Sequence, residues 1–242
     1  MKNIQEDIID KLIPEAIEDM KHIWFISDLH ADHPKIIKIC GRPVPLTEGL
    51  DVSIPEQKRR LNELHNDWLI REVYNKYIDR KDEVYLLGDI SLYPKKDADK
   101  FIDRLYGNKH LIAGNHDRNI LHSTRFGEIT LKKDFSYNRF GINIHIVLDH
   151  DPHASWNRKI HGSWHLFGHV HGRFGNLSPE IEKFLGLVWD VGIDNKKTYI
   201  DFNKKIQTNW CKPVNLYDVI QIMAWKSSVL GTYGINGEIN TE

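Results

Sequence analysis

The sequence has only two cysteines and no long hydrophobic run. Cys40 and Cys211 stand without a CxxC partner, which argues against a disulfide framework and against a thiolate zinc site. No apolar stretch approaches the roughly 18 residues that a membrane span needs. The first residues, MKNIQEDIIDK, are acidic and amphipathic instead of basic and then apolar. We therefore expect a cytoplasmic protein with no membrane association.

An excess of charge of either sign is also missing. The chain has 33 basic and 34 acidic residues, a formal net charge of -1 and a pI near 6.9. A near-neutral surface neutralises few phosphates at once, so we expect no tight binding of nucleic acid, although a local pocket can still be positive. The composition excludes neither an enzyme nor a binding module.

What remains is an ordinary globular composition, with 40% hydrophobic and 28% charged residues. The length of 242 residues suits one domain. We expect this domain to span residues 1–226, with a helical lead over about residues 1–20. Residues 227–242 lack periodicity, which predicts a flexible tail.

Three apolar segments end in polar residues and alternate with helical patterns. They are HIWFIS at 22–27, EVYLLGDI at 83–90 and KHLIAGNHDR at 109–118. The helical patterns between them predict crossovers at 35–40, 56–79 and 97–107, which implies a parallel sheet. Later segments at 140–150, 163–170, 187–193 and 197–202 are typical of antiparallel or mixed strands, and a final helix is expected to include 214–225. An α/β protein with two packed sheets flanked by helices accommodates both parts.

Five of the predicted strands end in Asp, His or Asn. The residues are Asp28 with His30, Asp89, Asn115 with His116 and Asp117, His150, and His169 with His171. Each has a simple structural explanation, such as a helix cap, a turn or a core histidine. Five such explanations in order along the chain are a poor joint account, because the strand ends of α/β sheets are where binding sites form. His169 and His171 lie two positions apart, so both imidazoles can point to one polar cluster.

The motifs DLH, GDIS, GNHD, LDHDP and GHVH resemble, in order, the five sequence blocks of the calcineurin-like metallophosphoesterases. The segment WFISDLHADHPKIIKICGRP is similar to the opening of the small bacterial and phage phosphoesterases of this superfamily. The resemblance fades after VGID at 191–194. It implies a four-layer αββα sandwich of two mixed β-sheets flanked by helices.

By position, the resemblance implies two divalent metal ions. Asp28, His30 and His171 would hold the first, and Asn115, His150 and His169 the second, while Asp89 would bridge them. Nitrogen and oxygen ligands suit manganese, iron or zinc, and we favour manganese. Two divalent ions outweigh the two carboxylate charges, so the site attracts anions such as hydroxide and phosphate. The expected reaction is in-line attack of a metal-bridging hydroxide on a phosphomonoester or phosphodiester, with nucleotide-derived esters among the candidates.

The resemblance also assigns roles beyond the metals. His116 is similar to the proton-donating histidine of the family, and Asp117 would orient it. His33 and Arg42 match positions that would grip other oxygens of the substrate, since arginine suits phosphate recognition. Arg42 could equally be a solvated loop residue.

Three alternatives to this phosphoesterase are weighed against it. A non-catalytic, metal-containing interaction scaffold with this fold would not need His116, and the chain keeps it. A nuclease needs appended DNA-binding regions, for which the chain lacks room and basic stretches. A protein phosphatase is disfavoured because GDISLYP and GNHD stand where that branch has GDxVDRG and GNHE. The substrate and the oligomeric state stay open at this point.

Overall fold

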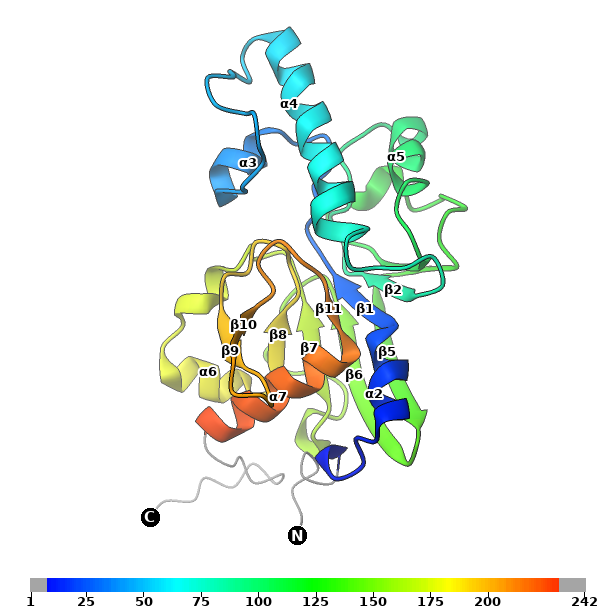
Figure 1. Cartoon of the computed structure of the whole chain (residues 1–242), viewed down its shortest axis with the longest axis vertical. Coiled ribbons are helices and arrows are strands. Elements are labelled where there is room, and N and C mark those ends of the chain that lie inside the picture. Colours follow the sequence, from blue (N-terminus) through cyan, green and yellow to red (C-terminus); the bar gives the residue numbers. More distant parts are fainter. Residues whose placement is uncertain (1–7, 231–242) are drawn as a thin grey trace.

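A computed structural model describes residues 8–230 of the chain. Its first sheet has five strands (Figure 1). In spatial order they are β11 (Val214–Asn215), β1 (Ile23–Ile26), β2 (Glu83–Leu86), β3 (Asn108–Ile112) and β4 (Glu128–Thr130). β1 to β4 are parallel, as the crossover helices require, and β11 pairs antiparallel with β1.

The second sheet has four strands, β5 (Lys132–Arg139), β6 (Ile142–Asp149), β7 (Trp164–Phe167) and β8 (Val188–Asp190). β5 and β6 form an antiparallel hairpin, and β6 to β8 are parallel. The hairpin turn consists of Phe140 and Gly141, both with positive φ, which matches the right-handed twist of the strands. A separate hairpin contains β9 (Thr198–Ile200) and β10 (Ile206–Thr208).

Helices connect and cover the sheets. They are α2 (Pro14–Lys21), α3 (Lys35–Cys40), α4 (Pro55–Trp68) with its π-helical continuation η1 (Leu69–Tyr74), α5 (Lys95–Ile102), α6 (Pro179–Leu185) and α7 (Leu216–Leu230), with short 3-10 turns η2 (Asp117–Asn119), η3 (Lys159–His161) and η4 (Arg173–Asn176). Proline begins α2, α4 and α6, where its fixed φ and missing N–H are no disadvantage.

The two sheets pack face to face around one apolar core. Phe25 of β1 and Ile112 of β3 meet Phe135 of β5 and Trp164 of β7 in this core. Neighbouring side chains of β1, such as Trp24 and Ile26, point to the other face because successive residues of a strand alternate. β1 is therefore buried on both faces, which explains why its sequence is apolar throughout.

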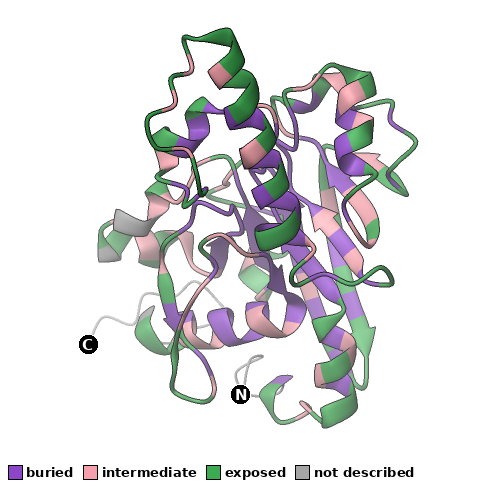
Figure 2. Cartoon of the chain, turned by 45° about the horizontal axis from the view of Figure 1, so that its top comes forward, coloured by how far each residue is buried: buried purple, intermediate pink, exposed green. Residues whose placement is uncertain are grey.

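The outer faces are covered unequally. α4, η1 and α5 pack on the first sheet and form a second large apolar cluster. The second sheet is covered by α6 and by the irregular segment that contains Trp156, in a much smaller cluster. α2 and α7 contact each other and close the core beside β11 and β1. Figure 2 shows the buried strands in the interior and exposed residues on the outer turns of the helices. The predicted class, two mixed sheets flanked by helices, is confirmed.

Element boundaries agree with the sequence pattern in most places. The helix predicted over 56–79 is α4 with η1, which ends at Tyr74. The final helix begins at Leu216 and not at 214, because Val214 and Asn215 form β11. It extends to Leu230, four residues beyond the expected end of the domain at 226. The short strands β4, β10 and β11 and the hairpin strand β5 were not predicted. Residues 1–7 of the helical lead and 231–242 of the expected tail lie outside the described residues. Within residues 8–230, every helix is too short or too polar to cross a bilayer.

Candidate metal centre

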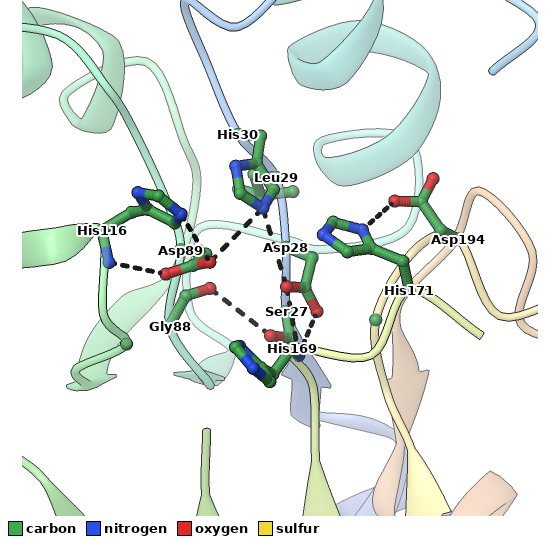
Figure 3. A network of polar contacts seen from close by, with 12 residues as sticks. Ser27, Asp28, Leu29, His30, Gly88, Asp89, His116, His169, His171 and Asp194 are labelled. Carbon is green, nitrogen blue, oxygen red and sulfur yellow. Dashed lines mark hydrogen bonds and ion pairs between the residues drawn. The ribbon is translucent and has the colours of Figure 1, made fainter. Parts of the chain in front are cut away.

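The candidate site lies where strands of both sheets end. Asp28 and His30 follow β1, Asp89 follows β2, Asn115, His116 and Asp117 follow β3, His150 follows β6, and His169 and His171 follow β7. A parallel bridge between Ser27 and Gly192 joins the end of β1 to the segment after β8. The two sheets therefore meet at this edge, and the loops that carry the polar residues converge there (Figure 3).

The backbone at the strand ends turns sharply. Asp28, His30, Asp89, His169 and His171 have φ between 50° and 69°, the left-handed region that side chains other than glycine seldom adopt. Asp and His tolerate this region better than most residues, but each such residue still costs free energy. A cluster of them is typical of a functional site, where packing and hydrogen bonds hold the loops in place.

Asp28, His30 and His171 form a first group of potential ligands. Their ligand atoms lie within 4.8 Å of one another. His30 is only 3% exposed, and neither of its ring nitrogens has a hydrogen-bond partner among residues 8–230. Because buried polar atoms are almost always paired, the ring of His30 fits a position that binds a metal ion.

Asp89, His150 and His169 form a second group, also with ligand atoms within 4.8 Å. Asn115 adjoins it, with Oδ1 3.2 Å from Nε2 of His150. The Oδ2 atom of Asp89 lies 3.4 Å from Nε2 of His30 and 3.5 Å from Nε2 of His150. The structure thus brings all seven predicted ligands together and puts the carboxylate of Asp89 between the two groups.

Two imidazoles are fixed from behind. Nδ1 of His150 donates a hydrogen bond of 2.7 Å to the carbonyl oxygen of Leu87, and Nδ1 of His171 donates one of 2.7 Å to the carboxylate of Asp194. Each bond keeps a proton on Nδ1, so Nε2 is the nitrogen that would bind a metal ion. This support of a histidine by a carbonyl or a carboxylate is typical of metal sites.

The site has a negative potential. Burial alone would lower the pKa of His150, but its hydrogen bond with Asp89 and the charges of Asp28 and Asp89 raise that pKa to about 9. Burial likewise opposes protonation of His171, whereas its bonds with Asp194 and Cys40 and the charge of Asp28 raise its pKa to about 10. The carboxylates therefore attract positive charge strongly at this edge, which favours cation binding.

His116 and His33 lie at the rim. The side chain of His116 is 48% exposed, and its Nε2 is 4.0 Å from Oδ2 of Asp89. The ring of His33 is 5.6 Å from the ring of His30, and its buried Nδ1 has no hydrogen-bond partner in the part of the chain that the structure describes. Burial and the neighbouring positive groups lower the pKa of His33 to about 4, so the ring is neutral near pH 7.

Arg42 requires a correction, because it neither faces the site nor lies in solvent. Its side chain is 0% exposed. The guanidinium donates two hydrogen bonds to Asp194 and one each to the carbonyl oxygens of Asp28 and Leu29. It also contacts Nε2 of His65 at 2.9 Å. With its donors engaged internally, Arg42 positions the loop after β1 and is not available to hold substrate.

Asp117 requires a correction as well. Its carboxylate does not contact His116 but accepts hydrogen bonds from the backbone N–H groups of Asp89, Ile90 and Gly114, at 2.8 to 2.9 Å. Asp117 is completely buried. It therefore holds the loops after β2 and β3 in place and acts on the site through Asp89.

Two acidic residues near the site were missed from the sequence. Asp194 supports His171, and Asp190 accepts hydrogen bonds from the backbone N–H groups of Gly172 and Gly192. Burial and the charge of Asp28 raise the pKa of Asp190 to about 7. The signal was present, since the predicted strand at 187–193 is a sixth apolar strand followed by an acidic residue.

Comparisons with known proteins agree with this geometry. The calcineurin-like phosphoesterase family matches residues 21–144. The uncharacterized protein MJ1445 of Methanocaldococcus jannaschii is 31% identical over 164 residues, which are 67% of this chain and 76% of that protein. The gene 66 protein of Mycobacterium phage D29 is 32% identical over 102 residues, which are 41% of this chain and only 42% of the phage protein.

A solved structure shares the fold. The crystal structure of the protein of unknown function AQ665 from Aquifex aeolicus matches with a TM-score of 0.52 at 20% identity, over 81% of this chain and 96% of that one. The chain belongs to the calcineurin-like phosphoesterase family. It is thereby assigned to the metal-dependent phosphoesterases in general, which implies divalent metals and a phosphorylated substrate.

The reassignment of Arg42 predicts a large loss of stability. Arg42→Ala leaves the buried charge of Asp194 without its partner and two carbonyl oxygens without a donor. Removing one member of a buried ion pair typically costs about 3–5 kcal/mol, and we expect a decrease of that size in the free energy of unfolding in urea. Arg59→Ala is the control, since Arg59 pairs with Glu56 and Glu63 on the surface and should change the midpoint little. If Arg42→Ala has normal stability and a raised KM for a phosphoester, Arg42 binds substrate after all.

Gly168 is expected to tolerate no side chain. A Cβ there would overlap Oγ of Ser27 and lie 2.6 Å from Oδ2 of Asp28. Gly168→Ala should therefore lower the free energy of unfolding by about 1–3 kcal/mol and reduce metal content after dialysis. Gly127→Ala is the matched control, because the nearest atom to its Cβ is 3.6 Å away. Equal stability and equal metal content in the two variants would contradict the close packing of β7 against β1.

Proposed function

We propose that this protein is a phosphoesterase that uses two divalent metal ions to hydrolyse a phosphomonoester or a phosphodiester, with nucleotide-derived esters among the candidates. The observation that carries the proposal is the buried carboxylate of Asp89, which lies between two ligand groups. The unpartnered ring nitrogens of His30 beside it support the same conclusion. We further expect the protein to act in the cytoplasm.

The donors fit the proposed ions. One ion would be held by Asp28, His30 and His171. The other would be held by Asn115, His150 and His169, and Asp89 would contribute to both sites. Imidazole, carboxylate and carboxamide ligands suit manganese, which we favour, as well as iron or zinc. When bound, such ions lower the pKa of water from about 16 to about 7 and polarise the phosphoryl oxygens.

The protein itself supplies position and a proton. Asp194 and the carbonyl of Leu87 orient the rings of His171 and His150, and Asp117 fixes the loop of Asp89. The side chain of His116 makes no hydrogen bond to another described residue and is open to solvent beside Asp89. It is therefore free to protonate the leaving oxygen of an ester, a step that a non-catalytic scaffold would not need. His33, which is neutral near pH 7 and has its ring 5.6 Å from that of His30, is a candidate contact for the substrate.

The proposed role of Asp89 predicts a loss of metal. Asp89→Ala removes the carboxylate shared by the two groups and should lose most of the manganese retained after dialysis, whereas His33→Ala should keep it. Elemental analysis of both variants and of the wild type gives the metal content per chain. Two fully occupied metal sites in Asp89→Ala would contradict the assignment.

Chelation of the wild type should abolish hydrolysis of an aryl phosphate.

The proposed role of His116 predicts an effect that depends on the leaving group. An alkoxide needs a proton to depart, whereas a nitrophenolate does not. General acid catalysis typically contributes about 10² to 10⁴-fold, so His116→Ala should lose about that much on an alkyl or nucleoside ester and much less on a nitrophenyl ester. Metal content should stay normal.

Two results would change this interpretation of His116. Equal losses on both esters would indicate electrostatic stabilisation or positioning by the imidazole instead of proton donation. Absence of hydrolysis by the wild type on any ester, with two metals bound, would favour the interaction scaffold.

A further inference from the structure

A groove of about 540 Å³ opens beside the candidate metal centre. His171 and Asp194 are among the residues that line it, together with Cys40, Arg173, Lys196 and Thr198. Figure 3 shows His171 and Asp194 at one side of the polar network, next to each other. A molecule bound at the metal centre can therefore extend past His171 into this groove.

The groove carries positive charge that no acidic residue balances. Arg173 and Lys196 are exposed, and neither forms an ion pair with any residue in the part of the chain that the structure describes. Lys197, also in the lining, is paired with Glu182. Asp194 is the acidic residue in the lining, and its carboxylate is fully engaged by Arg42 and His171. It therefore does not oppose an anion.

Both cations line the same groove as His171. Arg173 follows His171 by two residues and begins the short turn η4, so its backbone is fixed relative to that ligand. Nζ of Lys196 lies 4.8 Å from the centroid of the Trp210 ring. Such a contact restricts the lysine to one side of the groove. Two cations that line one polar groove favour an anion that reaches both, and arginine matches the geometry of phosphate.

We propose that this groove binds a second phosphate group of the substrate, through Arg173 and Lys196, while the first phosphate lies at the metal centre. The inference rests on the phosphoesterase function proposed above and narrows its substrate to a molecule with two separate phosphate groups. A simple monoester would leave the groove unused. The interaction is exposed to solvent, so it weakens as the salt concentration rises.

Competition against 4-nitrophenyl phosphate tests the proposal. The manganese-loaded protein is inhibited with butyl phosphate, which has one phosphate, and with butane-1,4-diol and hexane-1,6-diol bisphosphates, which have two at different spacing. We expect at least one bisphosphate to inhibit about tenfold more strongly than butyl phosphate, as a charge-assisted contact allows. In the double variant Arg173→Ala with Lys196→Ala this preference should fall to within about twofold, with unchanged metal content and melting temperature.

A matched variant controls for the loss of two charges. Lys81 and Lys132 are exposed and lie outside the groove lining, so Lys81→Ala with Lys132→Ala should keep the full preference. Hexanoate with a phosphate on carbon 6 has a carboxylate in place of the second phosphate, and so it tests whether the groove prefers phosphate to carboxylate. We expect it to inhibit less strongly than hexane-1,6-diol bisphosphate. Equal inhibition by the two would overturn the choice of phosphate.

The outcomes separate this inference from the proposed function. If the protein hydrolyses the aryl ester but shows no preference for bisphosphates as inhibitors, the phosphate site in the groove is overturned and the proposed phosphoesterase function stands. A preference that survives in the Arg173 and Lys196 variant also overturns the phosphate site. If the wild type hydrolyses no ester, the proposed function fails, and calorimetry measures the affinity of the same compounds instead. Tighter binding of a bisphosphate than of butyl phosphate, lost in the double variant, would then still support the groove. Absence of that preference in calorimetry overturns the groove too.

Discussion

The ion pair between Arg42 and Asp194 is the contact on which the candidate site depends most. It connects the loop after β1 to the segment after β8, and so it ties the first sheet to the second. Burying two charges is expensive unless further hydrogen bonds satisfy them. Arg42 meets this condition by donating to the carbonyls of Asp28 and Leu29, and Asp194 by accepting from His171. Burial opposes ionisation of Asp194, yet these bonds hold its pKa well below the usual range.

A second buried carboxylate, that of Asp117, holds the loops of the other half of the site in place. Asp117 accepts three backbone N–H groups from the loops after β2 and β3, and it thereby fixes Asp89 between the ligand groups. Neither Asp117 nor Asp194 needs to touch substrate or metal. Both stabilise left-handed backbone that would otherwise be unfavourable, so part of the stability of the fold maintains the strained geometry of the site.

The sequence predicted that the polar residues at the strand ends would lie together, because that prediction depends on local pattern. An apolar strand that ends in Asp or His shows in the residues themselves, and parallel strands bring such ends to one edge. Arg42 and Asp117 were misassigned for the opposite reason, since their roles depend on burial and on partners 152 and 28 residues away. β4, β10 and β11 were missed because strands of two or three residues contain too little pattern.

The net charge of the chain, -1, hides a local separation of charge around the candidate site. The carboxylates of Asp28 and Asp89 make the metal centre negative, which suits cations, while Arg173 and Lys196 make the adjoining groove positive. Bound divalent ions would reverse the sign of the centre and leave it continuous with the groove as one positive surface. The same residues would then favour metal first and a phosphorylated anion afterwards, so the order of binding follows from the placement of charge.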